Sequence, residues 1–130
     1  MSYCLDSSIV IALFRGDEEL HAKFLEISQT EDIYITYITL CELYKGVFLG
    51  KLFKKGSSEL DDFLQSVNIL DFNIESCKYF GEEYARLEKI GKATQEPDLM
   101  IASIAKVNGL TIVTRNKKHF ENINSSIEVW

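Results

Sequence analysis

The chain has 130 residues, of which 46% are hydrophobic and 26% charged, with one proline and seven glycines. This composition is typical of a single globular domain over residues 1–130, and it excludes a disordered, fibrous or multidomain protein. The formal net charge of −6 excludes a protein that coats nucleic acid through its overall charge, so nucleic-acid binding would need a local basic patch or a bound cation.

Nothing in the sequence indicates a membrane protein. The longest unbroken apolar run covers residues 9–14, far below the roughly 20 residues of a membrane-spanning helix, and no signal-peptide pattern opens the chain. We therefore expect a cytoplasmic protein. The cysteines Cys4, Cys41 and Cys77 fit neither a disulfide framework nor a zinc site, and we expect them to be buried thiols.

Short β-type stretches alternate with helical patterns along the chain. The predicted strands are Ser2–Leu5, Ile33–Thr36, Asn68–Leu70, Thr111–Thr114 and Ile127–Trp130. The predicted helices cover residues 7–15, a segment capped by Asp17, residues 39–50, a segment near 60–67, a segment from 77 to 91, and residues 97–108. The last of these is apolar on almost all sides, so it should be central and buried. Strand and helix alternation of this kind predicts an α/β fold with a parallel sheet covered on both faces.

Polar residues follow the predicted strands, where parallel α/β sheets bind ligands. Asp6 directly follows the first strand, and Glu42 is expected in the first turn of the helix after the second strand. Asp98 lies in the first turn of the central helix, and Asn116 comes two residues after the strand that ends at Thr114. Three acids from distant segments thus lie where a predicted strand gives way to a helix or where a helix begins.

Each of these residues also has a purely structural interpretation. Asp6 can cap its helix, and Thr39 to Glu42 fits a capping box. Asp98 suits the positive end of its helix dipole, and Asn116 suits a turn. Helix capping alone does not explain why acids from three distant segments all take such positions. This shared position favours a common site.

A common site for the acids would need a cation. Two carboxylates ~4 Å apart repel each other by about 4 kcal/mol at an effective dielectric constant of about 20. Oxygen ligands without a histidine or cysteine partner suit Mg²⁺ or Mn²⁺. The pattern therefore predicts one of these ions as a cofactor.

Four segments in this order resemble the PIN-domain ribonucleases, and most closely the VapC-type toxins of prokaryotic toxin–antitoxin pairs. They are Tyr3–Ile9, Thr39–Gly46, Asp98–Ala105 and Thr111–Phe120. The resemblance implies a three-layer α/β/α sandwich with a central, mostly parallel sheet, and metal-dependent hydrolysis of RNA by an acidic quartet. Asp6, Glu42 and Asp98 match three of its members, and Asn116 occupies the fourth position, where the family often has Asp. The resemblance also implies that the hydroxyl group of Ser7 or Ser8 adds a contact at this acidic site.

Our interpretation is an Mg²⁺- or Mn²⁺-dependent endoribonuclease that acts as the toxin of such a pair. Asp6, Glu42 and Asp98 would hold the ion, Asn116 would complete the catalytic set, and no side-chain nucleophile is needed. A housekeeping PIN nuclease and a non-catalytic binding module, whose acids only cap helices, remain as alternatives.

Two basic stretches adjoin the predicted site and are candidates for RNA contacts. One contains Lys45 together with further lysines up to residue 55, and the other surrounds Asn116 with Arg115, Lys117 and Lys118. The alternative is a solvated basic face without a ligand. His21 and His119 lack ligand spacing and are interpreted as surface residues.

A second apolar surface is expected beyond the core-facing stripe of the helix over 39–50. It consists of Phe48, Leu49, Leu52 and Phe53, and a lone domain seldom exposes such a patch. In the family that the chain resembles, this region accepts the antitoxin's C-terminal segment, and homodimers are usual. The alternative is that a later helix covers these residues.

Overall fold

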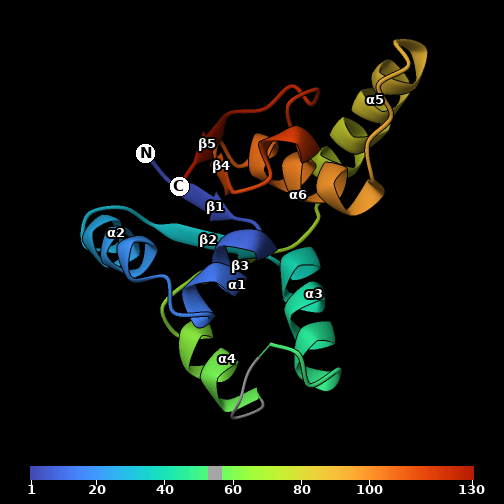
Figure 1. Ribbon diagram of the computed structural model, residues 1–130. Helices are drawn as coiled ribbons and strands as arrows, with labels where there is room; N and C mark the ends of the chain where they lie inside the picture. Colours follow the sequence, from blue (N-terminus) through green and yellow to red (C-terminus); the bar gives the residue numbers. More distant parts are fainter. Residues whose placement is uncertain (53–56) are drawn as a thin grey trace.

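The computed structural model describes residues 1–52 and 57–130, and within them five strands form one sheet (Figure 1). The strand order is β3-β2-β1-β4-β5, and every pair is parallel. This confirms the α/β fold and the parallel sheet. The strands are β1 (Tyr3–Leu5), β2 (Ile33–Thr36), β3 (Asn68–Leu70), β4 (Thr111–Thr114) and β5 (Ile127–Val129).

Helices cover both faces of the sheet, which confirms the three-layer arrangement. Figure 1 shows α1, α2 and α4 on one side of the sheet and α5 and α6 on the other. The helices are α1 (Ser7–Phe14), α2 (Glu18–Ser28), α3 (Tyr37–Phe48), α4 (Ser57–Leu64), α5 (Ile74–Lys89) and α6 (Glu96–Val107), with a 3₁₀ turn, η1, at Lys117–His119.

Alternate residues of the strands point to opposite faces of the sheet, as the two-residue period of a strand requires. Leu5, Ile35 and Val113 pack in the core cluster formed with α1, α2 and α4. Cys4 and Ile112, their neighbours in sequence, pack in the second cluster with α5 and α6. The sheet thus has an apolar core on each side, and α6 is buried as predicted from its composition.

The strand order places a topological switch point between β1 and β4. From β1 the chain adds β2 and β3 on one side of the sheet, whereas β4 and β5 lie on the other. Leu5, the last residue of β1, pairs with Val113 of β4, and β4 continues by one residue to Thr114, so the two strand ends lie next to each other. Ligands of parallel sheets bind beyond the carboxyl ends of strands at such a point.

The helix after β2 begins earlier than predicted. Thr36, the last residue of β2, is also the N-cap of α3, and its hydroxyl accepts a hydrogen bond from the Thr39 N–H at 3.1 Å. The predicted capping box from Thr39 to Glu42 is therefore wrong, because the strand runs into the helix without a loop. Glu42 lies in the second turn of α3 rather than in the first.

The cysteines are only partly as predicted. Cys4 is buried, whereas Cys41 and Cys77 are exposed. The buried face of α5 runs through Ser76, Glu83 and Leu87 rather than through Cys77. None of the helices in the described ranges combines the length and apolar character needed to cross a bilayer.

Candidate active site

Asp6 lies at the switch point and is almost completely buried, with 5% of its surface exposed. It follows β1, caps α1, and donates its backbone N–H to the Val113 carbonyl at 3.0 Å. Its Oδ1 accepts hydrogen bonds from the Ser8 hydroxyl at 2.5 Å and the Ile9 N–H at 3.3 Å, and its Oδ2 accepts one from Thr114 at 2.5 Å. A carboxylate has roughly four acceptor positions. These contacts leave room on Oδ2 for an external ligand.

Thr114 connects Asp6 to the segment that follows β4. Its side chain is fully buried, and its Oγ1 accepts the Asn116 N–H at 2.9 Å while donating to Asp6. The Arg115 N–H donates to Ser8 Oγ at 3.0 Å. The backbone at Asn116 is therefore held beside Asp6, although the Asn116 side chain is exposed and does not cap η1. Thr114 is not among the site residues predicted from the sequence, where its signal is a polar residue at the end of an apolar strand.

Glu42 approaches the same place from α3. Partial burial raises the pKa of its carboxyl group, and the negative charges of Asp98 and Asp6 raise it further. A hydrogen bond from Ser7 and the positive charge of Lys45 act in the opposite direction. Ser8 thus donates a hydrogen bond to Asp6, and Ser7 forms one with Glu42.

Asp98 reaches the site from the first turn of α6, as predicted. Burial raises the pKa of its carboxyl group, the charge of His119 lowers it, and the charge of Asp6 raises it. His119 Nδ1 lies 3.5 Å from Asp98 Oδ2. The interpretation of His119 as an ordinary surface residue is therefore incomplete, because η1 brings this exposed side chain to the edge of the site.

The three carboxylates come from separate elements, and the negative charge of Asp6 acts on both Glu42 and Asp98. Asp6 therefore lies within electrostatic range of the other two acids, and Asp98 within range of Glu42. In the described ranges, no three aspartate, glutamate, histidine or cysteine side chains are already close enough together to hold a metal ion. The three carboxylates are thus not arranged as a coordination sphere in this structure.

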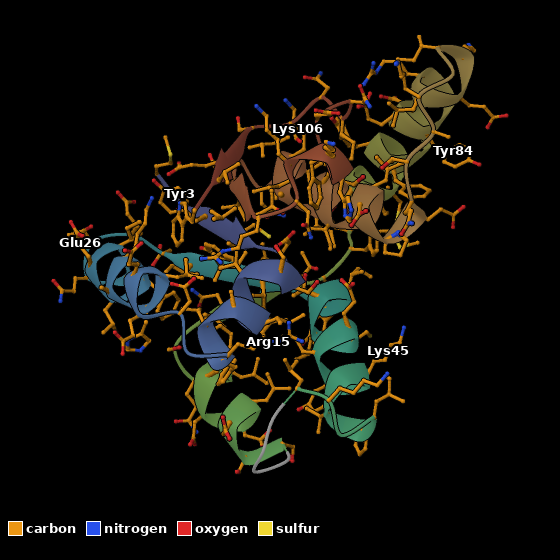
Figure 2. All side chains as sticks on the ribbon, viewed as in Figure 1. Tyr3, Arg15, Glu26, Lys45, Tyr84 and Lys106 are labelled. Carbon is orange, nitrogen blue, oxygen red and sulfur yellow. The ribbon has the colours of Figure 1, made fainter. Side chains whose placement is uncertain are left out.

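The basic residues predicted to contact RNA lie on or beside elements that also carry the acids or their partners. Lys45 is exposed in the last turn of α3, and its side chain points outward (Figure 2). Lys117 and Lys118 are exposed in η1. Arg115 forms an ion pair with Asp17 at 2.5 Å.

The predicted apolar surface is present only in part. Phe48 and Leu49 are 84% and 57% exposed. Leu52 differs from the prediction, because it packs against the core cluster and closely over Gly46, where the chain turns back after α3. Phe53 lies outside the described residues. The exposed apolar surface of the described chain at this end of α3 is therefore Phe48 and Leu49.

Comparison with known proteins identifies the family. The PIN domain model matches residues 3–125. The chain belongs to the PIN-domain family. Ribonuclease VapC2 of Rickettsia felis is 35% identical over 100% of this chain and 98% of that protein, and ribonuclease VapC2 of Haemophilus influenzae is 32% identical over 95% and 92%. Within the PIN family, the chain is thus a VapC-type ribonuclease toxin.

A solved structure agrees with this assignment over the whole chain. It is the crystal structure of VapBC2 from Rickettsia felis bound to a DNA fragment from the promoter, with a TM-score of 0.91 and 33% identity over 100% of this chain and 99% of that one. PIN-domain VapC nucleases are generally metal-dependent. These relatives favour the VapC interpretation over a housekeeping nuclease or a non-catalytic module.

Proposed function

We propose that this PIN domain cleaves RNA by metal-dependent hydrolysis, and that Asp6, Glu42 and Asp98 hold Mg²⁺ or Mn²⁺. The observation that supports this most strongly is the gathering of negative charge around the buried Asp6. The three carboxylates come from separate elements, yet burial and the negative charge of Asp6 raise the pKa of both Glu42 and Asp98. Negative charges gathered in this way are only partly compensated by the protein's own cations, and a divalent cation would complete the compensation.

The donor set fits such an ion chemically. All of the candidate ligands are oxygens, which Mg²⁺ and Mn²⁺ prefer. Asp6 keeps acceptor capacity on Oδ2 and is held rigidly by Ser8 and Thr114. Glu42 is exposed and Asp98 is half-buried, so both carboxylates remain accessible to an ion.

The residues of the chain would have separate roles in hydrolysis. The bound ion supplies a Lewis acid that lowers the pKa of water and neutralises charge on the phosphate. Ser8 and Thr114 orient Asp6, while Ser7 orients Glu42. Asn116 offers an amide beside the site without adding charge, and the lysines of α3 and η1 attract the RNA backbone.

The test is the substitution Asp98→Asn in the purified protein. We expect it to reduce Mn²⁺-dependent RNA cleavage on the order of 100-fold, because a charged ligand becomes neutral while its size is kept. Glu96→Gln is the matched control, since Glu96 lies in the same first turn of α6 but is exposed. Wild-type cleavage by Asp98→Asn would contradict the proposed function.

We also propose that the exposed apolar end of α3 binds the cognate antitoxin in the cytoplasm. Phe48 is almost fully exposed, and among the described residues its ring stacks on Tyr44, with ring centroids 6.3 Å apart. Related VapC chains occur in toxin–antitoxin complexes. Burial of one such aromatic side chain contributes roughly 1.5–3 kcal/mol to an interface.

Co-purification tests this surface. With the antitoxin from the adjacent reading frame co-expressed, Phe48→Asp should abolish its capture by the tagged toxin. Ile74→Asp is the control, because Ile74 is 76% exposed on α5. Unchanged capture by Phe48→Asp would contradict the proposal. Loss of a toxin homodimer with antitoxin capture intact would assign the surface to a second copy of this chain instead.

A further inference from the structure

A cavity of about 580 Å³ lies along one side of α1, next to the acidic site. Ser8, Ile11, Ala12 and Arg15 line it at intervals of three and four residues, which is one face of the helix. Arg115 and Asn116, from the segment after β4, line the opposite wall. Two elements that position the acidic site thus also build this cavity.

Hydrogen bonds fix the cavity relative to Asp6. Ser8 Oγ donates to Asp6 Oδ1 at 2.5 Å and accepts the Arg115 N–H at 3.0 Å. Ser8 is therefore shared between the proposed metal ligand and the cavity wall. A ligand group in the cavity would lie beside whatever is bound at Asp6.

The charges of the cavity favour an anion. Its lining contains two arginines and one acid, Asp17. Asp17 already pairs with Arg115 at 2.5 Å, and its other oxygen accepts the Leu20 N–H at 3.0 Å as the N-cap of α2. Among the residues that the structure describes, the Arg15 guanidinium has neither a hydrogen-bond nor an ion-pair partner. One positive charge therefore remains for a ligand.

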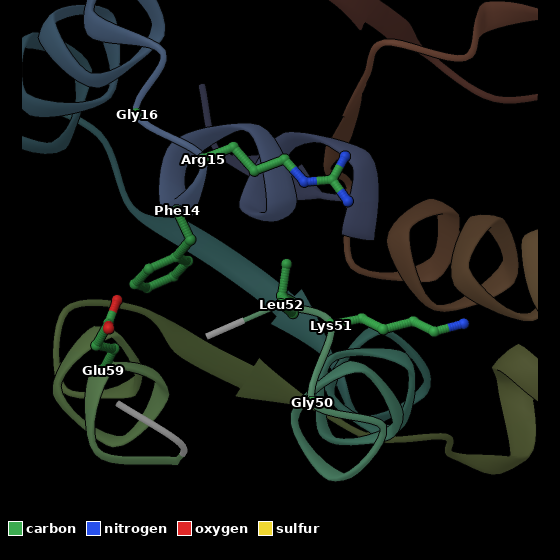
Figure 3. A pocket seen from close by; sticks show the side chains of 7 residues that line it. All are labelled: Phe14, Arg15, Gly16, Gly50, Lys51, Leu52 and Glu59. Carbon is green, nitrogen blue, oxygen red and sulfur yellow. The ribbon is translucent and has the colours of Figure 1, made fainter. Parts of the chain in front are cut away.

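Arg15 also borders a second cavity, of about 500 Å³, which Lys51 lines as well. Figure 3 shows the Arg15 and Lys51 side chains extending in the same direction. The chain as a whole carries a net charge of −6. The lining of this second cavity nevertheless contains two exposed cations, Arg15 and Lys51, and one acid, Glu59.

We propose that Arg15 binds a backbone phosphate of the RNA strand adjacent to the phosphate that is cleaved, and that Ile11 and Ala12 contact the attached nucleoside. This inference rests on the proposed ribonuclease function. A guanidinium forms paired, charge-assisted hydrogen bonds with a phosphate. The apolar wall formed by the two aliphatic side chains suits the face of a sugar or base. The cavity falls within the range of about 300–1,000 Å³ that is usual for small-ligand sites.

The test compares Arg15→Gln with the wild type in Mn²⁺-dependent cleavage of a labelled single-stranded RNA oligonucleotide. We expect KM to rise about tenfold and kcat to stay within about twofold, because Arg15 would contact the substrate away from the reacting atoms. The negative slope of log(kcat/KM) against log salt concentration should become shallower by about 0.7, the share of one phosphate contact on a single strand. Arg15→Lys keeps the positive charge, so its KM should rise less than that of Arg15→Gln.

Lys78→Gln is the control, because Lys78 is an exposed cation on α5, away from both cavities. Wild-type KM and salt slope for Arg15→Gln would overturn the inference, as would a fall in kcat with unchanged KM. Asp98→Asn in the same assay separates the two proposals. If Asp98→Asn is inactive and Arg15→Gln behaves like the wild type, only the role of Arg15 fails. If Asp98→Asn cleaves normally, the metal-dependent mechanism itself fails.

Discussion

At the scale of single residues, the site depends on how Asp6 is held. A buried carboxylate is costly unless it is hydrogen-bonded, and Asp6 meets this requirement with Ser8, the Ile9 N–H and Thr114. The same bonds fix its orientation. The polar residues around it therefore serve both the stability of the fold and the placement of a proposed metal ligand.

Thr114→Val removes one of these bonds while preserving the shape of the side chain. It leaves Asp6 Oδ2 without its donor and the Asn116 N–H without its acceptor. We expect the free energy of unfolding, measured with urea, to fall by about 1–3 kcal/mol. Thr114→Ser keeps the hydroxyl and should lose less. A Thr114→Val protein as stable as the wild type would contradict the importance of this bond.

The pKa values of Glu42 and Asp98 predict how stability depends on pH. Both pKa values are raised in the folded protein. A carboxyl group with a raised pKa favours the folded state at pH values below its unfolded pKa, and this contribution is lost as the pH rises through the folded value. The metal-free protein should therefore lose stability as the pH increases above about 4, the ordinary range of these groups.

Asp98→Asn tests this relation, because the amide stays neutral at every pH. In EDTA at neutral pH we expect the variant to melt about 2 °C above the wild type, a modest value since water screens part of the repulsion. The difference should vanish in mildly acidic buffer below the unfolded pKa. Glu96→Gln should not show this pattern. An Asp98→Asn protein that melts below the wild type at neutral pH would contradict the repulsion among the carboxylates.

At the scale of elements, the junction between β2 and α3 decides how Glu42 is presented. Thr36 ends the strand and caps the helix, which moves Glu42 into the second turn, facing the other acids. Thr36→Ala should lower the free energy of unfolding by about 1 kcal/mol, as expected for loss of an N-cap. Chemical denaturation measures this directly. Unchanged stability of Thr36→Ala would restore the capping box at Thr39 that the sequence suggested.

Sequence patterns predicted the strands better than the helix faces. Short apolar runs between polar residues mark β2 and β4 at their observed bounds. The face of α5 was not predictable, because Glu83 is buried only through its ion pair with Arg86 and its hydrogen bond from the Asn124 N–H. Asn124 is distant in sequence, and the spacing of apolar residues contains no signal for an ion pair between residues three apart on the same helix.

In the candidate site, too, some residues have a local sequence signal and others are brought in only by the fold. Asp6, Glu42 and Asp98 could be predicted, because each carries charge at a strand exit or near the start of a helix. Thr114 reaches Asp6 only through the pairing of β1 with β4, and His119 reaches Asp98 only through the turn at η1. Contacts of this kind depend on strand register and chain reversal, which a single sequence does not specify.

At the scale of the whole molecule, the parallel sheet gathers negative charge at one point and positive charge around it. The strand order brings the ends of β1 and β4 together, and α3 and α6 add their acids from either side. Arg15, Lys45 and Lys118 supply local cations on a chain whose net charge is −6. This arrangement suits a polyanion that is bound through a divalent ion and steered by nearby basic side chains.

The measurement that tests the central claim most directly is the melting temperature during a titration with Mn²⁺. An ion that binds only the folded state at ten times its Kd stabilises it by about 1.4 kcal/mol, which corresponds to a rise of about 5 °C for a chain of this size. We predict this rise for the wild type and for Glu96→Gln, and its loss in Asp98→Asn. An equal rise in Asp98→Asn, or no rise in the wild type, would contradict the claim that these carboxylates together hold a divalent ion.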